Sequence, residues 1–188
     1  PGLNRRRMTP ERSIRNLALT GFMGTGKSTI GHGVAHQLNF EFLDTDHLIE
    51  TRAGKTIPEI FAQDGEPAFR DWEARIVAEL ASRENLVIST GGGLGANPEH
   101  LASLKHHALV VCLWATAEII WERVRHLSHR PLLQVPDPEA RIRQLLTERE
   151  PVYRQADVLI NTGPRPARDV IQHVLREFLS VQRQQRCR

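Results

Sequence analysis

Eight consecutive residues, Gly21 to Ser28, have the types and spacing of a phosphate-binding loop (P-loop). They read Gly-Phe-Met-Gly-Thr-Gly-Lys-Ser and match the pattern G-x-x-x-x-G-K-[ST]. Glycines allow backbone angles that turn N–H groups toward phosphate oxygens, and a helix beginning at Lys27 would add favourable partial charge. In such loops the lysine reaches the β- and γ-phosphates of a nucleotide, and the serine hydroxyl binds Mg²⁺. The motif therefore predicts a nucleotide site with Lys27 and Ser28 in these roles.

Two carboxylates, Asp44 and Asp46, stand where a strand is expected to give way to a helix. At this spacing they can serve separate purposes. One can bind a magnesium-coordinated water, and the other can contact the hydroxyl group of a phosphoryl acceptor. The alternative is a helix N-cap followed by a solvated acid. Beside a P-loop we favour the catalytic interpretation.

A run of glycines, Thr90-Gly91-Gly92-Gly93, follows another expected strand. Consecutive glycines cost conformational entropy, and a plain turn seldom needs three of them. Close approach of a ligand to the backbone is one reason to keep them. Taken alone, the run is compatible with either interpretation.

Short apolar runs alternate with helical patterns along the whole chain. The expected strands are Leu17–Thr20, Phe40–Asp44, Leu86–Ser89, Leu109–Trp114 and Val158–Ile160. The expected helices are Lys27–Leu38, Asp46–Ala53, Ile57–Asp64, Glu66–Ser82, a short one opened by Asn97, Thr116–Leu127, one from Asp137 to about Gln155, and Ala167–Val181. Strands separated by helices predict an α/β fold, a three-layer α/β/α arrangement around a five-stranded parallel sheet. Ligands of such sheets bind at the carboxyl ends of the strands.

Length and composition are those of an ordinary globular domain. The 188 residues suit one domain, and the longest apolar run, Ala108 to Ala115, is far shorter than a membrane span. We see no secretory signal, and two cysteines without an evident pairing fit a reduced, cytoplasmic setting. We therefore expect a cytoplasmic protein with no membrane partner.

The net charge of +3 comes from basic residues concentrated at the two ends of the chain. We interpret residues 1–15 as a mobile basic arm, 16–181 as the single folded domain and 182–188 as a polar tail. Aromatic residues make up 5% of the chain, which suggests no base-stacking platform. We expect no nucleic-acid partner, and a monomer.

Six motifs, taken in order, resemble those of the shikimate kinases, within the wider group of nucleoside-monophosphate-kinase-like P-loop kinases. They are G-x-x-G-x-G-K-S-T at Gly21–Thr29, F-L-D-T-D at Phe42–Asp46, I-x-E-I-F with D-G-E-x-x-F-R from Ile57 to Arg70, S-T-G-G-G at Ser89–Gly93, R-P-L-L at Arg130–Leu133 and E-R-x-P-x-Y at Glu148–Tyr153. Any one could be accidental, but the ordered set is specific, and it covers about Leu17 to Leu175.

The resemblance implies a P-loop kinase fold with a small lid at about 123–136. It also implies Mg²⁺-dependent transfer of the γ-phosphoryl group of ATP to the 3-hydroxyl of shikimate, in the biosynthesis of chorismate and aromatic amino acids. ATP and shikimate would be its small-molecule partners. Arg130 would swing in on the lid and contact the phosphates, and Glu73 would orient Arg70.

The resemblance also assigns roles to individual residues. The catalytic residues would be Lys27, Asp46 and Arg130. ATP would contact Gly24, Thr25, Gly26, Lys27, Ser28, Thr29, Arg123, Arg130 and Arg165. The substrate would contact Asp46, Arg70, Gly91, Gly92, Gly93 and Arg149, and Mg²⁺ would be held by Ser28 and, through water, by Asp44. Arginine suits such a clamp because its planar fork grips a carboxylate with two hydrogen bonds.

Three alternatives remain open at this point. Another small-metabolite kinase, such as a gluconate or nucleotide kinase, would explain the P-loop and lid but not the glycine run together with the paired arginines. A P-loop module that binds nucleotide and signals through a partner would draw on the basic tails. The chain could also be one module of a longer multifunctional enzyme of the same pathway.

Overall fold

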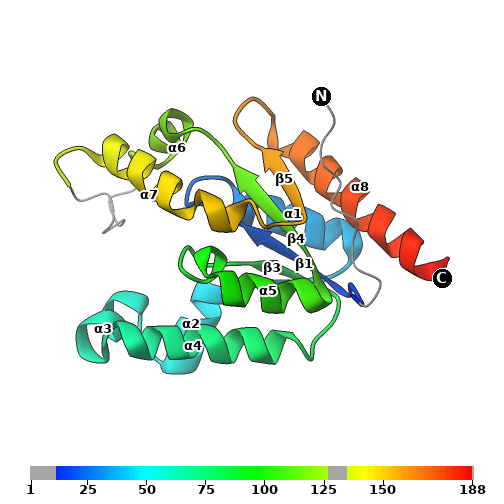
Figure 1. Cartoon of the computed structure of the whole chain (residues 1–188), viewed down its shortest axis with the longest axis horizontal. Coiled ribbons are helices and arrows are strands. Elements are labelled where there is room, and N and C mark those ends of the chain that lie inside the picture. Colours follow the sequence, from blue (N-terminus) through cyan, green and yellow to red (C-terminus); the bar gives the residue numbers. More distant parts are fainter. Residues whose placement is uncertain (1–11, 127–134, 188) are drawn as a thin grey trace.

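A parallel sheet with helices on both faces forms the centre of the molecule (Figure 1). The computed structural model describes residues 12–126 and 135–187. The strands are β1 (Asn16–Thr20), β2 (Glu41–Asp44), β3 (Leu86–Ser89), β4 (Ala108–Trp114) and β5 (Val158–Asn161), paired in parallel in the order β2-β3-β1-β4-β5. The helices are α1 (Lys27–Leu38), α2 (Thr45–Ala53), α3 (Ile57–Gln63), α4 (Gly65–Leu80), α5 (Pro98–His107), α6 (Ala117–Val124), α7 (Pro138–Tyr153) and α8 (Ala167–Arg186), with a short 3-10 helix η1 (Leu94–Ala96). The predicted α/β class with a five-stranded parallel sheet is confirmed.

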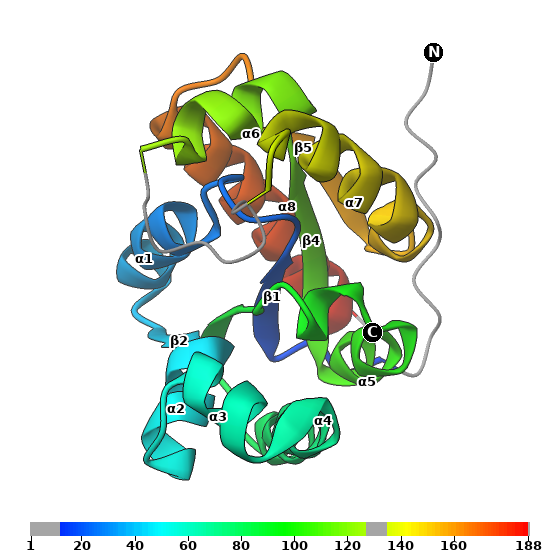
Figure 2. The same ribbon diagram turned by 90° about the vertical axis from the view of Figure 1, so that its left-hand side faces the viewer.

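Two apolar clusters fill the two sides of the sheet. On one face α1 and α8 pack against the strands, where Val34 and Val174 join Leu19 in one cluster. On the other face α4, α5 and α7 cover the sheet, and Leu104 and Val110 belong to the cluster there. Figure 2 shows these helices on opposite sides of the strands, as the predicted three-layer arrangement requires. Among the described helices, none combines the length and the apolar character that crossing a membrane demands.

Capping residues explain where two of the helices begin. Thr56 and Glu59 form the predicted capping box of α3, in which Thr56 N donates to Glu59 Oε2 (2.8 Å) and Glu59 N donates to Thr56 Oγ1 (3.4 Å). Asn97 caps α5, its Oδ1 accepting a hydrogen bond from Glu99 N (2.8 Å), and Pro98 takes the first helical position. These side chains satisfy N–H groups that a helix start leaves unpaired, so both helices begin where predicted.

The closing helix runs further than the sequence predicts. α8 continues to Arg186, whereas the predicted end is Val181 and residues 182–188 are predicted to be a polar tail. The extra turns are held by two glutamines, because Gln182 Nε2 donates to Ile14 O (2.6 Å) and Gln185 Nε2 donates to Arg12 O (2.7 Å). The last turns of α8 are therefore part of the folded domain.

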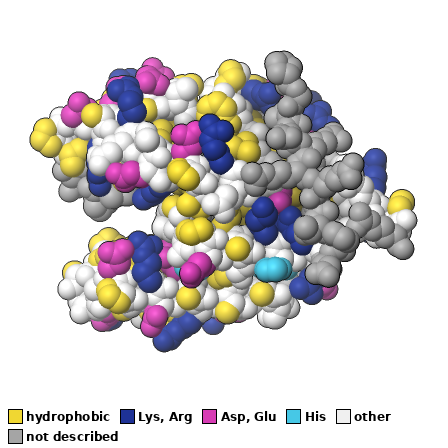
Figure 3. Space-filling model, in the orientation of Figure 1, with side chains coloured by type: hydrophobic (Ala, Val, Ile, Leu, Met, Phe, Trp, Pro, Cys, Tyr) yellow, Lys and Arg dark blue, Asp and Glu magenta, His cyan; other side chains and the backbone are white. Residues whose placement is uncertain are grey.

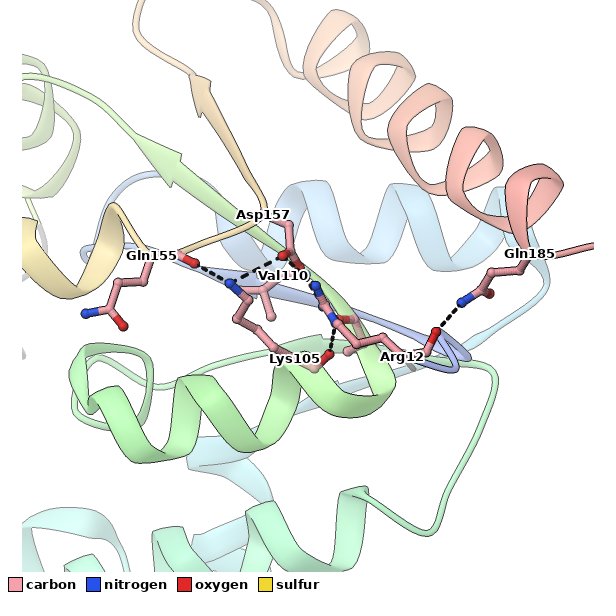
Figure 4. Close-up of polar contacts among 7 residues, drawn as sticks. Arg12, Lys105, Val110, Gln155, Asp157 and Gln185 are labelled. Atoms are coloured by element: carbon pink, nitrogen blue, oxygen red, sulfur yellow. Dashed lines mark hydrogen bonds and ion pairs between the residues drawn. The ribbon is translucent and has the colours of Figure 1, made fainter. Parts of the chain in front are cut away.

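Arg12 anchors the segment before β1 to the amino ends of the strands (Figure 4). Its guanidinium donates to both carboxylate oxygens of Asp157 (2.7 and 2.8 Å), to Ala108 O (2.8 Å) and to Lys105 O. Both side chains of the Arg12–Asp157 pair are only 10% exposed. The mobile arm is expected to include residues 1–15, but Arg12 belongs to the folded domain because its ionic contacts hold it in place. Residues 1–11 lie outside the described part.

Candidate active site

Three of the predicted site segments lie at the carboxyl ends of three neighbouring strands. The P-loop follows β1, Asp44 ends β2, and the Gly91–Gly93 run follows β3. Because the sheet order is β2-β3-β1, these three segments lie side by side. Figure 3, in the orientation of Figure 1, shows the surface hollowed on this side between the part formed by α6 and α7 and the part formed by α2, α3 and α4.

The P-loop has the backbone that anion binding requires. Gly24 and Gly26 adopt φ values of +75° and +93°, which residues with a Cβ rarely adopt, and a Cβ on Gly24 would also lie 2.7 Å from Val124 Cγ1. Gly26 caps α1 without a side chain, which leaves the first N–H groups of the helix for a phosphate. Lys27 Nζ lies over the loop and donates to Gly21 O (2.8 Å) and Phe22 O (3.0 Å).

The two predicted carboxylates have different environments. Asp44 is the N-cap of α2, and its Oδ1 accepts from Asp46 N (3.1 Å) and His47 N (3.4 Å), so the N-cap interpretation is correct for this oxygen. Burial raises the pKa of Asp46 to about 6, and the negative charges of Asp44, Glu73 and Glu50 add to the increase, while Lys27 opposes it. Asp46 is therefore a carboxyl whose pKa is close to the operating range of a general base.

Each glycine of the run borders a different charged side chain. A Cβ on Gly91 would overlap the Asp46 carboxylate, and a Cβ on Gly93 would overlap Arg70 Nη1. A Cβ on Gly92 would lie 3.5 Å from Arg149 Nη1. Asp46, Arg70 and Arg149 therefore converge on one stretch of backbone, where Gly91 and Gly93 leave the room that Asp46 and Arg70 occupy.

Arg70 is held in place by two carboxylates on its own helix. Its Nη1 donates to Glu73 Oε2 (2.8 Å), and its Nε and Nη2 donate to Glu66 Oε1 (3.2 and 2.7 Å). Partial burial works against the charged form, but the hydrogen bonds to Glu73 and Glu66 raise the pKa of Arg70. The Glu73 side chain is fully buried, whereas Glu66 is 63% exposed. The expected contact between Glu73 and Arg70 is present.

Arg149 reaches the same place from α7. Its Nη1 donates to Gly92 O (3.2 Å), and its guanidinium carbon lies 5.4 Å from the centre of the Phe22 ring, within the range of a cation–π contact. Burial raises the pKa of Tyr153, one turn further along α7, and the positive charge of Arg149 opposes that increase. Two arginines from separate helices thus flank the glycine run.

Arg123 connects the P-loop with the segment after β5. Its Nη1 donates to Gly24 O and to Thr162 Oγ1 (both 3.2 Å), and its Nη2 donates to Thr162 O (2.8 Å). Arg165 instead donates to His173 Nδ1 (3.1 Å) on α8. The structure therefore brings Arg123 to the P-loop, and among the described contacts none brings Arg165 there. Arg130 and most of the expected lid lie outside the described residues.

Three further residues contribute although the sequence interpretation gives them no role. Phe22, at a variable position of the P-loop, stacks under Arg149. Thr45 Oγ1 accepts a hydrogen bond from Gly91 N (2.8 Å) and so ties the start of α2 to the glycine run. Only Glu66 carries a sequence signal, because it precedes Arg70 by four residues on a predicted helix.

Comparisons with known proteins agree with this geometry. The family model described as shikimate kinase matches residues 23–179. A shikimate kinase of Caldanaerobacter subterraneus subsp. tengcongensis is 43% identical over 168 residues, which cover 89% of this chain and 98% of that protein. The solved structure of a shikimate kinase from Acinetobacter baumannii in complex with shikimate has a TM-score of 0.82 at 42% identity, covering 90% of this chain and 95% of that chain.

A second group of solved structures is similar in fold alone. A gluconokinase from Sinorhizobium meliloti 1021 has a TM-score of 0.59 at 18% identity, over 90% of this chain and 94% of that chain. At that identity the likeness concerns the fold alone. The chain belongs to the shikimate kinase family.

Proposed function

We propose that the protein is a shikimate kinase that transfers the γ-phosphoryl group of ATP to the 3-hydroxyl of shikimate, giving shikimate 3-phosphate and ADP on the route to chorismate. The observation that carries this proposal is the convergence of Asp46, Arg70 and Arg149 on Gly91–Gly93, beside the P-loop. Two arginines and one carboxylate suit an acceptor that carries one carboxylate and several hydroxyl groups.

The acceptor carboxylate would be held between the two arginines. Arg149 is positioned by Phe22 and Gly92 O, and Arg70 by Glu73, so both forks are oriented before a ligand arrives. Preorganised donors of this kind reduce the ordering entropy that binding requires. Asp46, across the glycine run, would then contact the acceptor hydroxyl groups.

Phosphoryl transfer would take place between Asp46 and the P-loop. Above its pKa of about 6 the Asp46 carboxylate is ionised and can accept the proton of the 3-hydroxyl as that oxygen attacks the γ-phosphorus in line. Lys27 would leave its loop carbonyls for the phosphate oxygens, and the first N–H groups of α1 would hold the β-phosphate. Arg130, on the lid, would close over the phosphates and exclude competing water.

The donor set fits Mg²⁺ as the accompanying cation. Ser28 offers an exposed hydroxyl in the first turn of α1, and Asp44 uses Oδ1 to cap α2, which leaves Oδ2 for a metal-bound water. Hydroxyl, carboxylate and water oxygens are the ligands that this hard cation prefers. When bound, Mg²⁺ would neutralise charge on the β- and γ-phosphates.

A cytoplasmic monomer is the form that we propose for the active enzyme. Cys112 and Cys187 are both free thiols, as a reducing compartment favours. All residues proposed for the site come from one chain. Light scattering coupled to size exclusion should give the mass of one chain, and the mass of a dimer would contradict the monomer.

A coupled ATPase assay tests the proposed reaction. ADP release should rise with added shikimate and not with gluconate or other hydroxy acids. The product should contain one phosphoryl group on the 3-hydroxyl by phosphorus and proton NMR. If shikimate does not stimulate ADP release while gluconate does, the proposed acceptor is wrong.

A further inference from the structure

Arg70 and Arg149 form what we call the acceptor clamp. Among the residues that the structure describes, the buried carboxylate that orients Arg70 has a hydrogen bond to only one of its two oxygens. Glu73 has a fully buried side chain, and its Oε2 accepts a hydrogen bond from Arg70 Nη1. Its Oε1 is buried too, and no hydrogen-bond partner for it lies among residues 12–126 and 135–187. A buried carboxylate oxygen without a donor is energetically expensive, so such an atom calls for an explanation.

A second unsatisfied atom lies on the neighbouring helix. His100 stands in the first turn of α5, where Asn97 Oδ1 accepts a hydrogen bond from its backbone N (3.3 Å), and α5 packs against α4. The residue is 9% exposed. Its ring Nδ1 is buried and, within the described part of the chain, has no hydrogen-bond partner. The helix that begins at this cap therefore packs against the helix that carries Glu73.

The charged groups that act on the His100 ring include both members of the Arg70–Glu73 pair. Burial lowers the pKa of His100, Glu73 and Glu99 raise it, and Arg70 lowers it further. Because the pKa is lowered from 6.5, the ring is mostly uncharged at neutral pH. A neutral imidazole still carries one N–H, and the tautomer protonated at Nδ1 would supply the donor that the Glu73 oxygen needs.

We propose that His100 is a positioning residue for the acceptor clamp, because its Nδ1–H satisfies Glu73 Oε1 through one buried water and so fixes the carboxylate that orients Arg70. A bridging water suits two polar atoms that are both buried and not in direct hydrogen-bond contact. The consequence for catalysis rests on the proposed function, since it concerns how the enzyme holds the carboxylate of shikimate.

Kinetics should separate this role from a structural one. His100→Leu removes the donor and should raise KM for shikimate roughly 3- to 10-fold, the effect of one lost hydrogen bond acting through Glu73. The kcat and the KM for ATP should stay within about 2-fold, because none of the described hydrogen bonds of the P-loop involves His100. His100→Asn keeps an N–H donor and should restore most of the KM. Exposed His106 on the same helix provides the control, and His106→Leu should change none of these values.

A double-mutant cycle and the ring tautomer complete the test. If His100 acts through Glu73, then His100→Leu should add nothing to the KM defect of Glu73→Gln. Histidine labelled with ¹⁵N should show the Nδ1–H tautomer for the resonance that disappears in His100→Asn. An Nε2–H tautomer, an unchanged KM in His100→Leu, or additive defects would each overturn the proposal. The tautomer is measured on the wild-type protein and assigned with His100→Asn, so it decides the matter even if His100→Leu does not fold.

Failure of the proposed function would look different. Wild-type protein without shikimate-dependent turnover would contradict the reaction and leave the tautomer of His100 as measured. Wild-type turnover with an unaffected His100→Leu variant would contradict the positioning role alone.

Discussion

The carboxylate of Asp46 lies against the backbone of Gly91 so closely that a Cβ at residue 91 would overlap it. The contact joins two segments that follow different strands, and Thr45 Oγ1 reinforces it by accepting from Gly91 N (2.8 Å). The position of the proposed base is therefore set by a glycine that carries no functional group. This relationship explains why a residue with no chemistry of its own belongs to the site.

Substitutions along the glycine run should affect different kinetic constants. Gly91→Ala pushes Asp46 away, so kcat should fall by about 10²-fold, the contribution of a positioned general base. Gly93→Ala crowds Arg70 and should mainly raise KM for shikimate. Gly92→Ala meets Arg149 at an ordinary contact distance of 3.5 Å and should change kcat and KM for shikimate the least of the three. Steady-state kinetics with shikimate varied at saturating ATP checks the order, and a Gly91→Ala enzyme with normal kcat would contradict it.

Asp46 should also make the metal-free protein less stable as the pH rises. The pKa is raised from 3.8 to about 6, so between these values the folded chain binds more protons than the unfolded chain. Stability then falls as pH rises through this window and stays lower above it. Asp46→Asn should raise the free energy of unfolding at pH 7 by on the order of 2 kcal/mol, and the gain should vanish below about pH 4.

Urea unfolding between pH 4 and pH 8, in the presence of a chelator, measures this difference. Asp71→Asn, an exposed carboxylate on α4, is the matched control and should show no such gain. A difference between Asp46→Asn and wild type that does not change with pH would contradict the raised pKa.

Strong local signals explain why so much of the fold can be predicted from sequence. β4 is apolar throughout, the P-loop stands between a strand and a helix, and Asn97-Pro98 marks the start of α5. The end of α8 escapes prediction because Gln182 and Gln185 are stabilised by partners in the segment before β1, far away in the sequence. Hydrophobic periodicity indicates how one helix or strand is buried, but it contains no information about contacts with segments that are distant in the sequence.

The residues of the candidate site also differ in how well the sequence predicts them. Asp46, Arg70 and Arg149 occur in recognisable motifs, so their type and order can be read from the chain. The stacking of Phe22 on Arg149 and the buried position of His100 depend on how α7 and α5 pack, and neither residue is distinctive in sequence. The residues proposed to bind the acceptor are therefore easier to predict from the sequence than the residues that hold their side chains in place.

The pairing of Phe22 with Arg149 should contribute to acceptor binding. Phe22→Leu keeps the apolar volume but removes the aromatic face, and a cation–π contact of about 0.5–1 kcal/mol corresponds to a 2- to 5-fold rise in KM for shikimate. Arg149→Lys loses the planar fork and should raise KM by a larger factor, on the order of tenfold or more. The two defects should be less than additive in the double variant. Arg149→Lys with wild-type kinetics would contradict the carboxylate clamp.

Arg12 should matter for stability and not for catalysis. Its buried pair with Asp157 is joined by Lys105 Nζ (3.4 Å from Asp157 Oδ1), and Val110 N donates to Asp157 Oδ2 (2.9 Å). Arg12→Ala leaves a buried carboxylate without its principal partner, which typically costs about 3–5 kcal/mol of unfolding free energy. The cluster lies at the amino ends of the strands, opposite to the proposed active site, so kcat and both KM values should not change.

Arg154→Ala provides the comparison for that prediction. Arg154 pairs with Glu150 on the surface of α7, with side chains 70% and 52% exposed, and such pairs contribute less than about 1 kcal/mol. Urea unfolding of both variants, with kinetics measured on the same preparations, makes the comparison direct. Equal stability losses in the two variants would show that the Arg12 cluster is an ordinary surface pair. A loss of kcat in Arg12→Ala at a temperature where it stays folded would instead mean that the amino ends of the strands are coupled to the site at their carboxyl ends.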